Sequence, residues 1–355
     1  MKRSPLPADL PIETVSTTPE GWRAQLRGAI RDPDQLIDRL SLSDELRPGA
    51  RRSHELFPCL VPESFLRRMV PGDPSDPLLR QVLPHLEEAE EAPEGFVADA
   101  VGDQAATRTP GLIHKYRGRA LLIVAGVCAV SCRYCFRRHF PYDETPATGE
   151  EWAPVLATIA ADDSIEEVIL SGGDPLMRSD RWLADLIEQI EAIPHVTRLR
   201  LHTRLPIVLP ARVDDDFLAL LDATRLAPTV VVHANHPNEI DAECGGALEG
   251  IVRAGIPVLN QSVLLRGVND AAEALIELSR RLLSVRVLPY YLHQLDRVVG
   301  AAHFEVPEAR GLELIEAMRA ALPGFGVPRY VREVPGAPNK VEIIPRDESP
   351  PRRQT

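Results

Sequence analysis

Three cysteines within eight residues form the part of the sequence best suited to chemistry. Cys128, Cys132 and Cys135 have the spacing Cys-x3-Cys-x2-Cys, so one short loop would present three thiolates. Three thiolates can hold an iron-sulfur cluster but leave one iron of a four-iron cluster without a protein ligand. That iron could bind and activate a small molecule. A zinc site completed by His139 is the alternative, although zinc loops more often use two Cys-x-x-Cys pairs.

The composition limits the kinds of protein that this chain could be. It has 355 residues and five cysteines, an odd number that does not suit a disulfide framework. The isolated Cys59 and Cys244 are expected to be small buried hydrophobic residues. A formal net charge of −12 argues against a surface for nucleic acid, and no stretch approaches the ~20 apolar residues of a membrane span. We therefore expect a cytoplasmic protein with no nucleic-acid or membrane partner.

The elements that would position the cysteines form a repeating pattern. Six short apolar runs alternate with stretches of helical periodicity, and the runs cover residues 119–127, 166–173, 198–204, 229–236, 257–265 and 285–293. Alternating strands and helices favour a parallel sheet with right-handed crossovers. We predict an α/β fold of the partial (β/α)6 barrel type. Because every run ends in polar residues, the chemistry should collect at the carboxyl ends of the strands.

The remaining segments are predicted to flank this barrel. We divide the chain into a flexible tail at 1–20, a helical N-terminal region and linker at 21–109, the barrel at 110–305, a C-terminal segment at 306–345 and a disordered tail at 346–355. Helical patterns in the N-terminal region cover 21–30, 32–40, 63–69 and 76–83, and Asp32 is a plausible N-cap. The acidic stretch 87–109 lacks periodicity and should be a connecting loop.

The cysteine motif, which follows the first predicted strand and has Tyr134 before its third cysteine, resembles that of the radical S-adenosylmethionine superfamily. Gly172, Gly173 and Asp174 after the second strand resemble the element of that superfamily that contacts the methionine amino group. Without the resemblance, a Gly-Gly pair would be an ordinary turn. The resemblance implies a 4Fe-4S cluster whose open iron binds S-adenosylmethionine, and reductive cleavage to a radical. Flavodoxin or ferredoxin is the kind of electron donor implied.

Longer segments resemble the lysine 2,3-aminomutase family within this superfamily. They are HKYRGRALL, CRYCFRRHF, LSGGDPL, RLPIVLPAR, NHPNEI, LNQSVLLRGVND, PYYLHQLDRVVGAAHF and GAPNK. The implied reaction exchanges the α-amino group of L-lysine with a β-hydrogen, which requires a radical and pyridoxal phosphate as an electron sink. The resemblance is strongest to the branch that supplies β-lysine for modification of translation elongation factor P. A separate lysyl ligase would pass the amino acid on.

The resemblance also implies roles for residues around the cofactors. Lys340 matches the lysine that holds pyridoxal phosphate, although by composition alone it would be a surface lysine. Lys115 and Arg119 match cationic positions for the cofactor phosphate. His233 and Gln261 match positions near the adenosyl group, whereas Asn235, His236 and Tyr290 could equally be structural.

Three further residues are implied to bind the substrate. Arg137 matches the arginine that grips the substrate carboxylate, where a planar guanidinium gives bidentate geometry. Asp296 and Glu333 match the two carboxylates of the pocket for the ε-ammonium group. By themselves, two acidic residues near strand ends would more often be caps or solvated charges.

The sequence departs from the catabolic members of the family. It ends fifteen residues after Lys340, and Ala271 stands where those members have a zinc cysteine, so we expect no zinc. Glu333 replaces their aspartate and lengthens one arm of the pocket. Two alternatives stay open: an aminomutase for another amino acid such as glutamate, and a degenerate barrel that uses its metal site only as a scaffold for partner binding.

Overall fold

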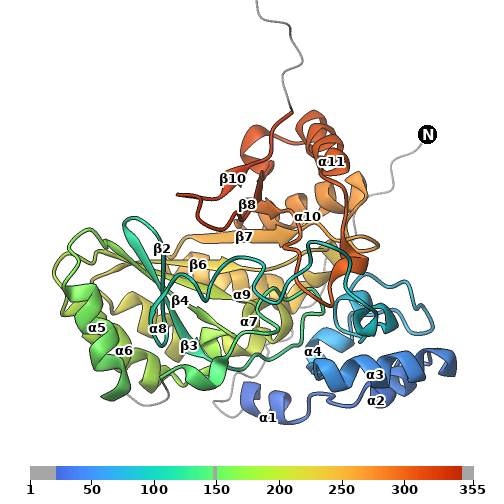
Figure 1. Cartoon of the computed structure of the whole chain (residues 1–355), viewed down its shortest axis with the longest axis horizontal. Coiled ribbons are helices and arrows are strands. Elements are labelled where there is room, and N and C mark those ends of the chain that lie inside the picture. Colours follow the sequence, from blue (N-terminus) through green and yellow to red (C-terminus); the bar gives the residue numbers. More distant parts are fainter. Residues whose placement is uncertain (1–20, 147–149, 346–355) are drawn as a thin grey trace, which may run out of the picture.

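One ten-stranded sheet organises the chain, and its strands lie in the order in which they occur in the sequence (Figure 1). This computed structural model describes residues 21–146 and 150–345. The predicted tails at 1–20 and 346–355 lie outside the described residues. The six predicted parallel strands are confirmed as β3 (Arg119–Ala125), β4 (Glu167–Gly172), β5 (Arg198–Thr203), β6 (Ala227–Val232), β7 (Val258–Val263) and β8 (Leu288–His293).

Short strands extend the parallel sheet at both ends. A seventh parallel strand, β9 (Arg329–Arg332), follows β8 and pairs antiparallel with β10 (Val341–Glu342). At the other end, β1 (Thr107–Thr109) and β2 (Leu112–Tyr116) precede β3 and pair antiparallel. Residues 87–109 are therefore more than the expected loop, because they include β1 and a 3-10 turn at Leu86–Ala89.

Amphipathic helices cover the sheet between successive strands. The predicted helices are present as α6 (Asp180–Glu191), α8 (Asp215–Asp222), α9 (Ala242–Arg253), α10 (Ala272–Ser284) and α11 (Glu308–Ala321), and α5 (Ala153–Ala160) and α7 (Leu205–Val208) add to them. Ser179, Asp214 and Asp241 cap α6, α8 and α9 by accepting a backbone N–H of the first turn. Cys244 lies fully buried on α9, as predicted for a small hydrophobic residue. No helix in the described part of the chain is long and apolar enough to cross a membrane.

The N-terminal region packs against the barrel as a group of short helices, seen in blue in Figure 1. They are α1 (Gly21–Arg27), α2 (Pro33–Arg39), α3 (Arg47–Leu56) and α4 (Glu63–Leu66). Asp32 caps α2 as predicted, with its carboxylate 2.9 Å from the backbone nitrogen of Asp34. The helix predicted over 76–83 is reduced to a 3-10 turn at Leu79–Gln81, although Asp76 accepts from the backbone nitrogens of Leu78 and Leu79 as an N-cap would.

A buried ionic cluster ties this N-terminal region to the cysteine loop. Both carboxylate oxygens of Glu88 accept from Arg133, at 2.8 and 2.6 Å, and one of them also accepts from Arg138 at 2.8 Å. Arg133 and Glu88 side chains are wholly shielded from solvent. Arg133 also donates to the carbonyl oxygen of Phe57 at 2.7 Å. Residues that precede the barrel therefore anchor the loop that bears the cysteines.

Replacing Glu88 with glutamine should destabilise the fold strongly. Two buried guanidinium groups would lose their shared countercharge, and breaking a buried ion pair in this way costs about 3–5 kcal/mol. Urea unfolding of the apoprotein measures the loss. Glu316→Gln, which removes one partner of the exposed pair with Arg319, is the control and should leave the midpoint unchanged. Equal midpoints for the two variants would show that the Glu88 cluster is not needed for stability.

Candidate active site

A cavity of about 260 Å³ lies where the carboxyl ends of the parallel strands meet. All the site residues predicted from the sequence line it: Lys115, Arg119, Cys128, Cys132, Cys135, Arg137, Gly172, Gly173, Asp174, His233, Gln261, Asp296, Glu333 and Lys340. The cavity thus gathers residues from β2 to the loop before β10. His236 does not line it and instead caps the turn Pro237–Glu239, which agrees with a structural role.

The cysteine loop starts directly after β3 and rests on the Gly172-Gly173 turn. The backbone nitrogen of Gly173 donates to the carbonyl of Ala125 at 2.7 Å, and that of Asp174 donates to the carbonyl of Val127 at 2.9 Å. A Cβ atom on Gly173 would lie 2.4 Å from the Val127 oxygen, and Gly172 has a φ of +121°. Only glycine fits this close approach, so the pair positions the loop as well as lining the cavity.

The three thiols all face the cavity from this loop. Burial raises the pKa of the Cys135 thiol to about 11 and that of Cys128 well above its usual range, so both are protonated before metal binds. No three donor side chains among the described residues converge as they would around a single ion. In an iron-sulfur cluster each thiolate binds a different iron, so the sulfurs need no common centre. The loop therefore fits a cluster with three cysteine ligands.

His139 does not complete this group of cysteines. Its side chain is exposed, does not line the cavity, and has Nε2 3.1 Å from the carbonyl oxygen of Val299. The zinc alternative needs a fourth ligand, and His139 is directed elsewhere.

Opposite charges alternate around the other end of the cavity. Asp103 lies 2.7 Å from Nε of Arg137 and 2.6 Å from Nζ of Lys115. Glu333 lies 2.6 Å from Nζ of Lys340 and 3.6 Å from that of Lys115. Two carboxylates thus hold three cations in place, although Asp103 belongs to the segment that the sequence suggested was a connecting loop.

Part of the Arg137 guanidinium group has no partner among the described residues. Nε donates to Asp103, and Nη1 donates to the hydroxyl of Ser171 at 3.1 Å. Nη2 has no hydrogen bond to any residue in the described ranges, and the side chain lines the cavity. Arg119 lies over the ring of Tyr116, with 4.5 Å from its central carbon to the ring centroid.

The two carboxylates Asp296 and Glu333 differ in charge state. Burial raises the pKa of Asp296 to about 7, although nearby Lys340 opposes the shift. Burial also favours neutral Glu333, but the Lys340 ammonium group and the hydrogen bonds from Lys340 and Tyr116 hold its pKa below the usual value. Glu333 is therefore ionised at neutral pH, whereas Asp296 keeps its proton to a higher pH than an ordinary carboxyl group does.

Five buried polar atoms around the cavity have no hydrogen-bond partner among the described residues. They are Nε of Arg204, Nε2 of His202, His233 and His293, and Oε1 of Gln261. Burial lowers the pKa of His233 to about 3, so its imidazole is neutral. Leaving such an atom unsatisfied costs about 1–3 kcal/mol. The group therefore favours a polar ligand that supplies the missing donors and acceptors, and S-adenosylmethionine is a ligand of that kind.

Comparison with known proteins agrees with this geometry. Residues 122–279 match the family model described as the Radical SAM superfamily. L-lysine 2,3-aminomutase of Haemophilus influenzae is 45% identical over 93% of this chain and 98% of its own length. The Escherichia coli protein of the same name is 46% identical over 94% and 97%. The chain belongs to the lysine 2,3-aminomutase family.

Other proteins are less similar to this member of the aminomutase family. L-lysine 2,3-aminomutase of Clostridium subterminale is 34% identical over 91% of this chain and 78% of its own length. Among solved structures, a radical SAM methyltransferase from Sphaerobacter thermophilus is 20% identical, with a TM-score of 0.45 over 62% of this chain and 68% of its own.

Sequence reasoning missed two groups in the site of this family member, Asp103 and Tyr116. The number of cations predicted for the pocket could have indicated a carboxylate such as Asp103. The predicted pocket held four cations, Lys115, Arg119, Arg137 and Lys340, against the two acids assigned to the substrate. Buried cations need partners, so another acid was required nearby.

Asp296→Asn should change how stability depends on pH. The folded pKa of about 7 lies above the ordinary value of 3.8, so the folded protein keeps a proton that the unfolded chain releases. Stability from this group is therefore lost as pH rises from about 4 to about 7. The stability of the variant relative to the parent should increase by about 3 kcal/mol between pH 5 and pH 8.

Denaturant unfolding of the apoprotein at several pH values measures this difference. Asp222→Asn, at the exposed end of α8, is the matched control and should follow the pH profile of the parent. An Asp296→Asn profile parallel to that of the parent would contradict a raised pKa at this site.

Proposed function

We propose that this chain is an L-lysine 2,3-aminomutase that binds a 4Fe-4S cluster, S-adenosylmethionine and pyridoxal phosphate. The observation that carries the proposal is one cavity that brings the three cysteines together with Lys340, Arg137, Asp296 and Glu333. The relatives in Haemophilus influenzae and Escherichia coli, matched over nearly their whole length, carry this name.

The cluster end of the cavity would bind the first two groups. S-adenosylmethionine on a reduced cluster supplies a radical that can remove hydrogen from an unactivated carbon. Cys128, Cys132 and Cys135 would hold the cluster, and Gly172 and Gly173 leave room beside it. Asp174 also lines this end, but Leu176, Thr203 and Arg204 donate to its carboxylate, which supports a role through its backbone and the turn. The unsatisfied atoms of His233 and Gln261 would contact the adenosyl group.

The opposite end would bind pyridoxal phosphate, which acts as an electron sink while nitrogen moves between carbons. The chain has three lysines, Lys2, Lys115 and Lys340, and the last two line the cavity. Lys115 donates to the carbonyl of Val101 at 2.7 Å and pairs with Asp103, so it is already held as a fixed cation. Lys340 would therefore hold the cofactor, and Lys115 with Arg119 would face its phosphate.

The charged residues favour lysine as the substrate. Arg137 would bind the carboxylate through the free edge of its guanidinium group. The ε-ammonium group would lie between Asp296 and Glu333. Lys340 is paired with Glu333 at 2.6 Å, and this carboxylate would turn to the substrate once Lys340 holds the cofactor. An acidic substrate such as glutamate would place a carboxylate against these acids, which would repel it.

The biological role that we propose rests on the resemblance to the branch that serves elongation factor P. The enzyme would act in the cytoplasm, accept electrons from a flavodoxin or ferredoxin, and supply β-lysine to a separate lysyl ligase. The proposed division of labour follows the chain: residues 110–305 bind the cluster and S-adenosylmethionine, and residues 306–345 bring Lys340 to the same cavity.

The direct test is to reconstitute the protein anaerobically with iron, sulfide and pyridoxal phosphate and to supply lysine, S-adenosylmethionine and dithionite. Chromatography should detect β-lysine, and Lys340→Ala and Cys132→Ala should each abolish it. Isomerisation of a different amino acid would refute lysine as the substrate. A protein that takes up neither cluster nor cofactor would support the scaffold alternative instead.

Borohydride reduction of the cofactor-loaded protein tests the assignment of Lys340 separately from turnover. Reduction fixes pyridoxal phosphate to the lysine that holds it, and peptide mass spectrometry should find the added mass on Lys340. Lys340→Ala should lose the label, whereas Lys115→Ala should keep it on Lys340 with weaker cofactor retention. Label on Lys115 in the parent protein would overturn the assignment.

A further inference from the structure

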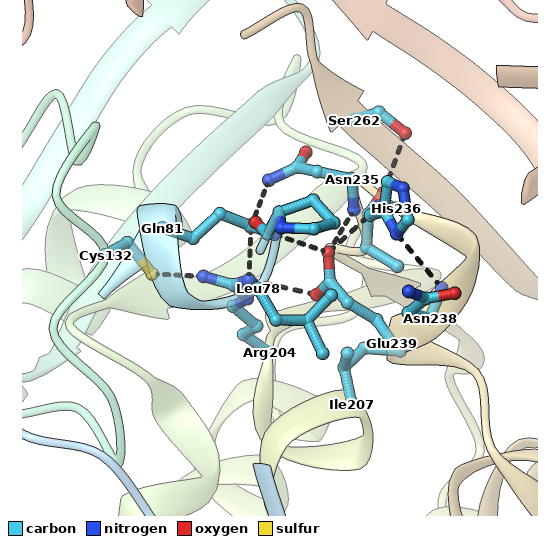
Figure 2. A network of polar contacts seen from close by, with 12 residues as sticks. Leu78, Gln81, Cys132, Arg204, Ile207, Asn235, His236, Asn238, Glu239 and Ser262 are labelled. Atoms are coloured by element: carbon cyan, nitrogen blue, oxygen red, sulfur yellow. Dashed lines mark hydrogen bonds and ion pairs between the residues drawn. The ribbon is translucent and has the colours of Figure 1, made fainter. Parts of the chain in front are cut away.

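A buried arginine donates a hydrogen bond to one of the three cysteines. Arg204 follows β5, and its Nη1 lies 2.7 Å from the sulfur of Cys132 (Figure 2). Among the described residues, Cys128 and Cys135 receive no such side-chain hydrogen bond. The surroundings of the three cysteines are therefore unequal, and the difference is one guanidinium group.

The protein fixes Arg204 without help from the cysteine. Its Nη2 donates to Oε1 of Gln81 at 2.7 Å and to Oε2 of Glu239 at 2.9 Å. Its backbone nitrogen donates to Asp174 at 2.7 Å. The guanidinium group also lies 5.6 Å from the ring centroid of Tyr134. Because these contacts set the side chain, it would still point at Cys132 when that sulfur binds iron.

The two side chains that hold Arg204 are themselves fixed. Oε1 of Glu239 accepts from the backbone nitrogens of Asn235 and His236, at 2.8 and 3.0 Å, and from Nε2 of Gln81 at 3.1 Å (Figure 2). Gln81 and Glu239 are both fully shielded from solvent. Gln81 belongs to the N-terminal region, so a residue outside the barrel helps to orient the Arg204 guanidinium group toward the cysteine loop.

Charge balance alone does not require this contact. Glu239 already compensates Arg204, and a buried guanidinium group can be satisfied by a carboxylate and a backbone carbonyl, as Arg212 is by Asp180 and Leu176 at 2.6 and 2.8 Å. Arg204 contacts the sulfur of Cys132 in addition to the carboxylate of Glu239. A hydrogen bond to a cluster-ligating sulfur stabilises the more negative, reduced cluster and raises its reduction potential.

We infer that Arg204 is a positioning residue that donates to the Cys132 thiolate of the assembled cluster and raises its reduction potential, with Gln81 and Glu239 holding it in place. The inference rests on the proposed function to the extent that Cys132 ligates a cluster. It assigns the N-terminal region a part in the redox properties of the site.

The test compares reduction potentials of reconstituted proteins by redox titration followed by electron paramagnetic resonance. The variant Arg204→Met/Glu239→Gln removes both charges together, so the network stays neutral and the backbone donors keep an acceptor. At a fixed applied potential its ratio of reduced to oxidised cluster should fall at least tenfold, equal to about 59 mV for a one-electron couple. The matched control is Arg212→Met/Asp180→Asn, which removes a buried guanidinium group and its partly exposed carboxylate partner outside the cavity, and it should match the parent.

Arg204→Lys provides a second measurement if the double variant fails to assemble a cluster. Its ammonium group keeps the charge but cannot span Glu239 and the sulfur together, so the ratio should fall by less than in the double variant. Pulsed resonance should also show the loss of one exchangeable proton coupled to the reduced cluster. A loaded variant with the potential and proton coupling of the parent overturns the inference. If the parent protein binds no iron and sulfide, the proposed function fails, and this inference fails with it.

Discussion

Compensation of buried cations by carboxylates is the constraint on which the site depends. Arg133 and Arg138 share Glu88, and Arg137 and Lys115 share Asp103. An unpaired charge in such surroundings would cost several kcal/mol. Each carboxylate in these pairs comes from a segment before the barrel. Folding the barrel with its cationic residues inside thus requires the N-terminal segment to pack against it, because the barrel lacks these countercharges.

The same constraint applies at the C-terminal side of the cavity. Glu333 and Lys340 follow β9 and come together at 2.6 Å, with Tyr116 donating to Glu333 from β2. This contact joins the first and last parts of the sheet across the open side of the barrel. The result is a continuous series of ion pairs along the cavity, from Arg137 through Asp103, Lys115 and Glu333 to Lys340.

Charge pairing also prepares the site for ligands. Glu333 is ionised and held by Lys340, whereas the carboxyl group of Asp296 accepts no hydrogen bond from a described residue and burial raises its pKa to about 7. Under the proposed function, a cationic substrate between them would displace the Lys340 ammonium group and the Asp296 proton together. Pairs with the substrate would then replace the pairs within the protein.

The order of six parallel strands and the cysteine loop could be predicted from the sequence because both are local. Apolar runs report buried strands directly, and Cys128, Cys132 and Cys135 lie within one loop. The resemblance supplied the distant residues such as Lys340. Only the tertiary structure showed that Asp103 pairs with Arg137 and that Arg204 reaches Cys132, since these contacts join segments 34 and 72 residues apart. Side-chain pairing across such distances leaves no periodic signal, and an acidic segment appears the same in sequence whether its carboxylates are solvated or buried.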